Sequence, residues 1–276
     1  MTMEFPRYEG ACDCHVHVYE DNWPLAPSAT FKPPHAPASA YRALQQALGL
    51  ARVVVVQPTG YGFDNRCTLA AIEQLGAGAR GVAVVPADVA QAELERLHEA
   101  GMRGVRFMML SGGLLGWDGL EAMAARTAPL GWHINLQLDG RELPQHEAML
   151  ARLRGRCVID HIGKFLGPVT LEGEAVQALC RLLDSGRFWV KLAAPYESSR
   201  SGPPGYADVA PLARLLASRF PERCLWASNW PHPNVRPAPS EQALLDWALR
   251  CFDGNEAGRR RMLVDNPAEL YGFGPA

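Results

Sequence analysis

Long apolar runs are missing from this sequence of 276 residues. It contains no stretch of about 18 apolar residues, the length that a membrane-spanning helix needs. The first ten residues also lack the apolar core of a secretory signal peptide. We therefore expect a cytoplasmic protein that does not bind membranes.

Charge of one sign is also scarce. The formal net charge is −2, and the only compact basic run is the three arginines at 259–261, which lie in a helical pattern. A solvated helix face explains that run better than a nucleic-acid surface does. We therefore do not expect a nucleic-acid partner.

Cysteine occurs seven times, an odd number, and without the paired spacing of a zinc finger. In a reducing compartment such residues behave as small buried side chains. Cys12 and Cys14 flank Asp13 on a predicted strand, and both should point to the same face of it. The cysteines therefore predict core packing rather than a redox role.

Short apolar runs alternate with amphipathic helical stretches along the whole chain. The apolar runs cover residues 11–19, 52–58, 80–86, 104–110, 132–138, 157–162, 188–194 and 224–230. Helical periodicity covers residues 40–48, 69–75, 92–100, 119–127, 145–154, 175–184, 209–219 and 241–251. Consecutive apolar residues, such as the four valines at 53–56, are typical of parallel strands buried on both faces. This alternation predicts one (β/α)8 barrel domain over residues 1–276.

An open, doubly wound sheet is the alternative fold for the same pattern. Such a sheet usually has a glycine-rich phosphate-binding turn after its first strand, whereas histidines occupy that position here. Proline-rich segments at 23–37, 201–204 and 231–239 follow the first, seventh and eighth predicted strands. We expect these segments to be loops over the mouth of a barrel.

Two histidines end the first predicted strand. His15 and His17 are two residues apart, so both side chains should face the same side of the strand. In a barrel that side is the mouth, where catalytic groups lie. Two neutral imidazoles there can bind a divalent metal ion or polarise a carbonyl together. His161 ends the sixth strand and should join them, with Lys164 just beyond it.

The eighth predicted strand makes the pattern specific, because it ends Ser-Asn-Trp-Pro-His-Pro at 228–233. Together with Asp-Cys-His-Val-His at 13–17 and with His161, this motif resembles the amidohydrolase superfamily. The branch that it resembles is typified by 2-pyrone-4,6-dicarboxylate lactonase. The similarity extends over nearly the whole chain and includes Gly-Val-Arg-Phe at 104–107 and Leu-Val-Asp-Asn-Pro at 263–267. It implies a barrel of the amidohydrolase type and an enzyme that hydrolyses lactones.

Position 229 departs from the pattern of that family. The resemblance implies an aspartate there, acting as general base or metal ligand, but this sequence has Asn229. A neutral amide cannot accept a proton at working pH. Three interpretations stay open: an inactivated form, a protein that uses another base such as His232, and a protein that does not catalyse.

The metal ligands of metal-dependent relatives are also incomplete. Those relatives place a histidine near the end of the fifth strand, whereas His133 lies at the start of that strand here. The fourth strand offers Arg106 and Met108 instead of a lysine or a carboxylate. The remaining ligands would be three histidines, namely His15, His17 and His161. We expect no required cofactor, and the alternative is one divalent zinc or manganese ion.

Arg106 lies inside the fourth strand, where a buried charge needs a partner. Its planar guanidinium suits a carboxylate, which could belong to the substrate or to Asp64. The resemblance implies arginines and a tyrosine around a second carboxylate, but the corresponding positions hold Gly112, Glu197 and Gln137. The candidates for other substrate contacts are Tyr41, Tyr61, Gln137, Lys164, Tyr196, Arg200 and His232.

These residues predict a hydrolase that opens a small carboxylated lactone. His15, His17 and His161 would polarise the scissile carbonyl, position 229 would hold the general base, and Arg106 would orient the substrate carboxylate. The alternatives are a metal-dependent sugar-lactone isomerase or lactonase, and an aromatic-acid decarboxylase on the same barrel. Outside the enzymes, the alternative is a non-catalytic small-molecule binding protein. The sequence leaves the oligomeric state open.

Overall fold

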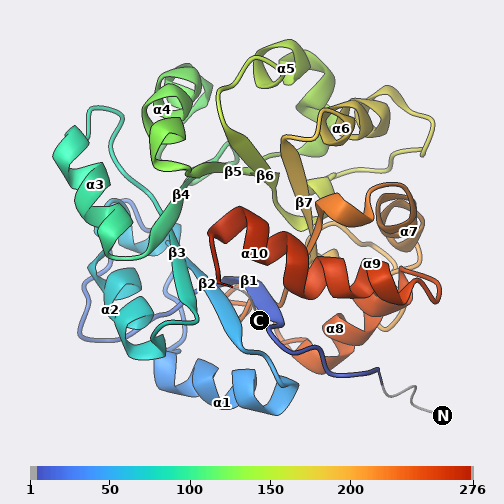
Figure 1. The fold of residues 1–276 in the computed structure, drawn as a ribbon, viewed down its shortest axis with the longest axis horizontal. Coiled ribbons are helices and arrows are strands. Elements are labelled where there is room, and N and C mark those ends of the chain that lie inside the picture. Colours follow the sequence, from blue (N-terminus) through green and yellow to red (C-terminus); the bar gives the residue numbers. More distant parts are fainter. Residues whose placement is uncertain (1–4, 275–276) are drawn as a thin grey trace.

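A computed structural model describes residues 5–274, which form eight parallel strands surrounded by helices (Figure 1). The strands are β1 (Cys12–Val16), β2 (Arg52–Val56), β3 (Ala79–Ala83), β4 (Met102–Met108), β5 (His133–Gln137), β6 (Arg156–Ile159), β7 (Phe188–Ala193) and β8 (Cys224–Ala227). The helices between them are α1 (Ala38–Leu48), α2 (Arg66–Leu75), α3 (Gln91–Glu99), α4 (Leu120–Thr127), α5 (Leu143–Leu150), α6 (Glu174–Asp184) and α7 (Ala210–Arg219). After β8 come α8 (Glu241–Arg250), α9 (Glu256–Arg260) and α10 (Asn266–Tyr271).

The strands follow one another around the barrel in chain order, each parallel to the next. Segments at the ends of β8 and β1 complete the circle: the backbone N–H of Asn229 donates to the carbonyl of His15 at 3.0 Å. The N–H of His17 donates to the carbonyl of Trp230 at 2.8 Å. The predicted (β/α)8 barrel is therefore confirmed, and all eight predicted strands and helices are present.

Apolar side chains fill two separate layers. Val54 and Val56 point into the barrel, where they join Trp189, while Val53 and Val55 pack outward under the helices. This division follows from the alternation of side chains along a strand. The seven cysteines are buried and unpaired, as predicted.

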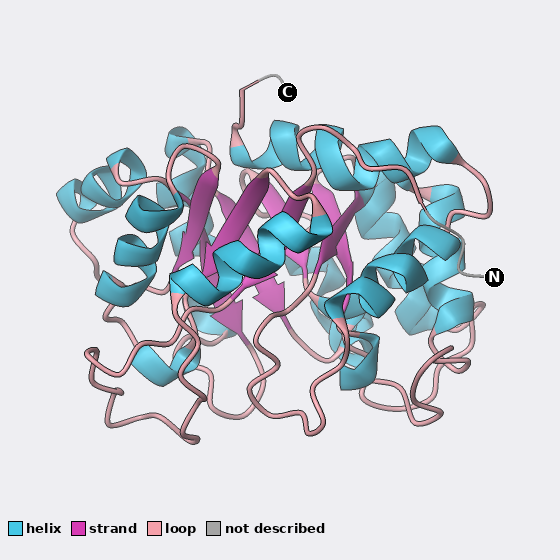
Figure 2. Cartoon of the chain, turned by 90° about the horizontal axis from the view of Figure 1, so that it is seen from below, coloured by secondary structure: helices cyan, strands magenta, loops and turns pink. Residues whose placement is uncertain are grey.

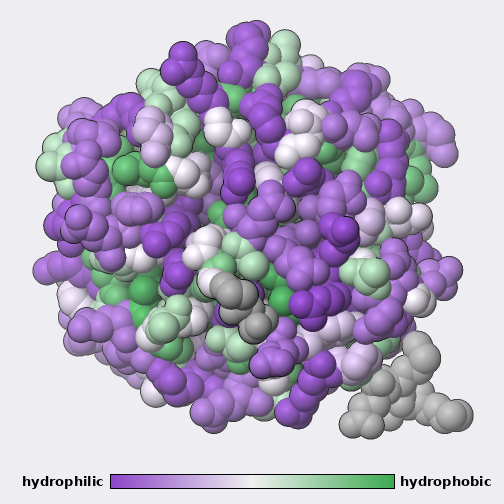
Figure 3. Space-filling model, in the orientation of Figure 1, coloured by the Kyte–Doolittle hydropathy of each residue, from purple (hydrophilic) through white to green (hydrophobic). Residues whose placement is uncertain are grey.

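The two ends of the barrel differ. Helix α10 lies across the end where the strands begin (Figure 1), and the long loops gather at the opposite end (Figure 2). Hydrophilic residues dominate the face that carries α10, with apolar residues scattered among them (Figure 3). Among the described helices, none is both long and apolar enough to cross a bilayer.

An irregularity in β1 decides which side chains reach the mouth. Its register against β2 shifts between Asp13 and Val16. Cys14 packs inside the barrel, and His15 also points inward, where it contacts Lys191 of β7. Two consecutive residues cannot both face inward on a regular strand, so the irregularity is what allows it. His15 and His17 still face the same space, because their Nε2 atoms lie 3.2 Å apart.

Candidate active site

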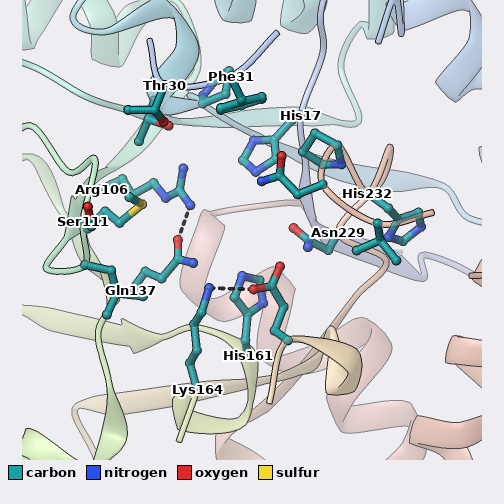
Figure 4. A pocket seen from close by; sticks show the side chains of 18 of the residues that line it. His17, Thr30, Phe31, Arg106, Ser111, Gln137, His161, Lys164, Asn229 and His232 are labelled. Atoms are coloured by element: carbon teal, nitrogen blue, oxygen red, sulfur yellow. Dashed lines mark hydrogen bonds and ion pairs between the residues drawn. The ribbon is translucent and has the colours of Figure 1, made fainter. Parts of the chain in front are cut away.

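The carboxyl ends of the strands surround a cavity of about 230 Å³. Figure 4 shows His17, Arg106, Lys164 and Asn229 pointing into the same space from different sides. The predicted site residues that line it are His17, Arg106, Gln137, Lys164, His161, Asn229 and His232. The proline-rich loops after β1 and β8 also contribute, through Thr30, Phe31, Pro233, Asn234 and Val235.

Five other predicted residues do not line this cavity, and one of them is Tyr196, which contacts Asn229. His15 lies beside it, with its Nε2 atom 3.2 Å from Nε2 of His17. Tyr41 belongs to α1, outside the barrel, and its hydroxyl donates to Asp13 at 3.2 Å. Tyr61 accepts the backbone N–H of residue 20 through its hydroxyl at 3.0 Å. Arg200 is exposed on the loop after β7. The last three residues therefore lie outside the lining of this cavity.

A buried lysine that the sequence analysis did not identify lies next to His15. Lys191 is 0% exposed, and its Nζ donates to the side-chain oxygen of Asn135 at 2.7 Å. Nζ also lies 3.0 Å from Oδ1 of Asp160 and 3.0 Å from Nδ1 of His15. Asn135 in turn donates to the other oxygen of Asp160 at 2.7 Å. The lysine charge is thus paired and fully surrounded by acceptors.

These contacts determine where the protons of the two β1 histidines lie. An ammonium group can only donate, so Nδ1 of His15 accepts from Lys191 and its proton lies on Nε2. Nδ1 of His17 lies 2.7 Å from the carbonyl oxygen of Val56 and must donate to it. The Nε2 atom of His17 is then an acceptor, and it receives the Nε2–H of His15. This donor and this acceptor are therefore engaged with each other, and neither histidine has a free N–H group for a ligand.

The three histidines of the mouth are neutral. Burial lowers the pKa of His17 to about 3, assisted by the nearby charge of Arg106. Burial also lowers the pKa of His161 to about 4 and that of His15 well below its ordinary value. Burial alone would raise the pKa of Asp160, but the charge of Lys191 holds it well below the usual range. Asp160 is therefore an ionised partner of the lysine.

A second chain of hydrogen bonds orients Asn229. The Glu241 carboxylate lies 3.4 Å from Nε2 of His232, so that nitrogen carries the proton. Nδ1 of His232 then accepts from the Tyr196 hydroxyl at 2.7 Å. The Tyr196 oxygen accepts the side-chain N–H of Asn229 at 2.9 Å. Because the amide nitrogen is engaged with Tyr196, the amide oxygen of Asn229 is left as the acceptor for a ligand in the cavity.

Arg106 is a buried cation without an acidic partner. It is 6% exposed, and it donates to the backbone carbonyl of Gln57 at 3.1 Å and to the side-chain oxygen of Gln137. Among the described residues no carboxylate forms an ion pair with it, because Asp64 pairs with Arg66 at 2.6 Å instead. Asp64 was therefore the wrong internal partner, and the guanidinium remains available to the cavity.

Lys164 and Glu197 form an ion pair of 2.7 Å in the cavity wall. Burial alone would raise the pKa of Glu197, but His161, Lys164 and Arg106 together lower it. Glu197 therefore stays ionised and holds Lys164 in place. From the family resemblance, Glu197 marked a lost substrate contact, and nothing in the sequence indicated this ion pair.

Strained backbone conformations gather at the mouth. His161, Lys164, Asn229 and His232 have positive φ angles of 53°, 43°, 61° and 57°. Residues other than glycine rarely adopt such angles, and those that do cluster at functional sites. The turns after β6 and β8 therefore hold these side chains at some cost in free energy.

The sequence contained a signal for the lysine. Lys191 is the one charged residue in the apolar run 188–194, and a charge on a strand buried on both faces must be paired. The same argument selected Arg106. Tyr196 was predicted only as a possible substrate contact, and Glu241 was not predicted at all. Nothing in the sequence indicated the contacts that they make, because these join residues distant in the sequence.

Comparison with known proteins identifies the family. The model of the amidohydrolase family matches residues 12–273. The chain belongs to the amidohydrolase family. This amidohydrolase is 38% identical to D-galactarolactone isomerase of Agrobacterium fabrum, over 98% of this chain and 93% of that protein. It is 35% identical to 2-pyrone-4,6-dicarboxylate hydrolase of Comamonas testosteroni, over 97% and 92% of the two chains.

The solved apo structure of an Agrobacterium tumefaciens protein has the same fold, with a TM-score of 0.93. The two are 37% identical, over 99% of this chain and 98% of that one. The prediction of an enzyme of the amidohydrolase type is confirmed by these similarities, which set aside the non-catalytic binding protein.

A metal site of the amidohydrolase type does not fit the residues present. The ligand atoms of His15, Asp160 and His161 lie within 4.8 Å of one another. Zinc is bound in a Burkholderia multivorans amidohydrolase that shares the fold at 20% identity, over 96% of this chain and 99% of that one, with a TM-score of 0.72. Here, however, Lys191 already places a positive charge 3.0 Å from both His15 and Asp160. A divalent ion bound there would be repelled by that charge.

Proposed function

We propose that this amidohydrolase isomerises a small carboxylated sugar lactone. A hydroxyl group of the substrate, rather than water, attacks the lactone carbonyl. The new C–O ester bond forms, the ring C–O bond breaks, and the hydroxyl proton passes to the departing ring oxygen. A six-membered lactone thereby becomes a five-membered one, and no water is consumed.

Asn229 is the observation that carries this proposal. Hydrolysis needs a base that takes a proton from water, and an amide cannot serve as that base. An alcohol already attached to the substrate lies close to the carbonyl at high effective concentration. The amide oxygen of Asn229, left free by the bond to Tyr196, would accept a hydrogen bond from that alcohol and orient it. Lactone isomerisation is thus the reaction that this site supports best.

An uncharged histidine, His161, lines the cavity and would stabilise the oxyanion that develops on the carbonyl oxygen. His15 lies behind His17, and its Nε2–H is engaged with Nε2 of His17. Fixed donors in a site that excludes water lower the barrier without reorganising as the charge forms. His17 has no free N–H group, because its Nδ1–H donates to Val56 and its Nε2 accepts from His15, which changes its role from the one expected from sequence.

Arg106 would bind the carboxylate of the substrate. A buried guanidinium whose partners are neutral gains most from an anionic ligand. Lys164 is already paired with Glu197, so the cavity offers one unpaired cation among its described residues. A lactone of a sugar diacid carries one free carboxylate and several hydroxyls, which fits this set. The similarity to D-galactarolactone isomerase supports the same substrate class.

Hydrolysis is the second candidate, and one feature of the cavity favours it. The Glu197 carboxylate lines the wall, and a relative of this chain is a lactone hydrolase. Glu197 is a weak base, however, because its pKa is lowered and Lys164 occupies one of its oxygens. Glu197 would therefore activate a water molecule poorly.

The test is a product analysis by ¹³C NMR. Six-membered lactones of several sugar diacids are incubated with the protein, and the five-membered lactone and the open acid are followed separately. The proposal predicts that the five-membered lactone appears first and faster than in buffer. Sole production of the open acid would favour hydrolysis, and no change with any lactone would contradict both candidates.

A further inference from the structure

The strongest unexplained feature outside the proposed chemistry is the charge buried next to His15. We propose that Lys191 takes the place of a metal ion in this barrel: it fixes the proton of His15 on Nε2 and excludes a divalent cation. Lys191 is a positioning residue, because it touches His15 and Asp160 and does not line the cavity. The inference concerns the histidines themselves and does not depend on which lactone reaction takes place.

Two independent contacts place the proton of His15 on the same atom. On one side, Lys191 must donate to Nδ1 of His15. On the other, Nε2 of His17 has a lone pair and can only accept, because Nδ1 of His17 donates to the carbonyl of Val56. A proton on Nδ1 of His15 would oppose the lysine and would leave two lone pairs facing each other 3.2 Å apart. Lys191, through its contact with His15, and the carbonyl of Val56, through its contact with His17, thus favour the same arrangement of protons.

The same pair has the spacing of a metal site. Zinc binds histidine nitrogen at about 2.0–2.1 Å, so two nitrogens 3.2 Å apart can hold one ion between them. Binding requires a lone pair on both Nε2 atoms, and with Lys191 present only His17 has one. Asp160, the carboxylate close enough to help, is already paired with the lysine. One ammonium group therefore removes a nitrogen ligand, neutralises an oxygen ligand and adds a repulsive charge.

Removing the lysine should reverse all three effects. In Lys191→Met, Nδ1 of His15 would face Asp160 at 3.4 Å and take a proton to donate to it. The lone pair on Nε2 of His15 would then be free, and Asp160 would act as the outer partner that orients a metal-binding histidine. The variant should bind zinc where the native protein does not.

The experiment measures zinc binding by calorimetry on chelator-treated protein. We expect Lys191→Met to bind one zinc ion at least about tenfold more tightly than the native protein, within the 10–100-fold range typical of outer partners. Lys191→Arg, which keeps a positive charge, should not gain affinity. The double variant Lys191→Met with His15→Gln should lose the gain. Equal zinc affinity in the native protein and in folded Lys191→Met would overturn the proposal.

A second measurement needs no folded Lys191 variant. ¹⁵N NMR of histidine side chains in the native protein reports which ring nitrogen carries the proton, and His15→Gln identifies the signals of His15. The proposal predicts a proton on Nε2 and a bare Nδ1 at neutral pH. A protonated Nδ1 in the native protein would overturn it even if Lys191→Met fails to fold. Neither result depends on activity, so the proposed isomerisation is tested separately.

Discussion

Asn229 donates its side-chain N–H to the hydroxyl of Tyr196 at 2.9 Å, and this bond determines which end of the amide faces the cavity. Tyr196 receives its own direction from His232 and Glu241. The side chain of Asn229 is therefore oriented by a chain of contacts, although an amide cannot take up a proton.

Tyr196→Phe should lower kcat with little change in KM. The variant frees the Asn229 amide to rotate, and a hydrogen bond is worth about 0.5–1.5 kcal/mol, which corresponds to roughly 2–10-fold in rate. Steady-state kinetics on the preferred lactone measures this. The matched control is Tyr61→Phe, which also removes a phenolic hydroxyl with two hydrogen bonds but lies outside the cavity. Equal effects on kcat in the two variants would show that Tyr196 has no specific role.

Asn229→Asp should convert part of the turnover from isomerisation into hydrolysis. A carboxylate at this position can take a proton from water, and general-base catalysis is typically worth about 10²–10⁴-fold in rate. The fold should not change, because aspartate and asparagine have nearly the same shape. The ratio of open acid to five-membered lactone is read by NMR. An unchanged ratio in a folded, active variant would mean that position 229 does not control the nucleophile.

Arg106→Lys should weaken binding of the carboxylated lactone by about 1.5–3 kcal/mol, the range for hydrogen bonds to charged groups. Lysine keeps the charge but loses the planar pair of donors. Affinity is compared for the free acid and its methyl ester. Arg66→Lys is the control, because Arg66 forms an exposed pair away from the cavity. Equal affinity of the native protein for acid and ester would exclude Arg106 as the carboxylate site.

Stability should fall as the pH is lowered from about 6.5 towards 4. Burial lowers the pKa of His17 and His133 to about 3 and that of His161 to about 4. In this window the unfolded chain, with histidine pKa near 6.5, binds protons that the folded chain does not, so acid favours unfolding. Asp13 acts in the opposite sense, because burial raises its pKa to about 6.

The net effect should follow the histidines, which outnumber Asp13. Urea unfolding at several pH values gives the free energy of unfolding. If the free energy of unfolding stayed constant or increased as the pH fell from 6.5 to 4.5, the result would contradict neutral buried histidines.

The sequence predicted the barrel and part of the site for identifiable reasons. His15, His17, His161 and Arg106 could be found because polar residues at the carboxyl ends of buried strands have few explanations other than function. Tyr41, Tyr61 and Arg200 were chosen by residue type alone, and such a choice carries no information about direction. Tyr41 faces Asp13 outside the barrel, and Arg200 faces solvent.

The orientation of the hydrogen-bonding groups could not be predicted from the sequence. The proton position on His15 depends on Lys191, which lies 176 residues away along the chain, and the direction of the Asn229 amide depends on Glu241 through two intermediates. Hydrogen-bond chains of this kind arise only from the folded geometry. Residue types can therefore locate a site, whereas its donors and acceptors have to be read from contacts.

The most direct test of the central claim is the isomerisation of a carboxylated six-membered sugar lactone in water enriched in ¹⁸O. The substrate's own hydroxyl should be the nucleophile, so the first-formed five-membered lactone should carry no ¹⁸O in its carbonyl or ring oxygen by mass spectrometry. Incorporation of one ¹⁸O atom per turnover, with the open acid as the first product, would show that water attacks and would contradict the account.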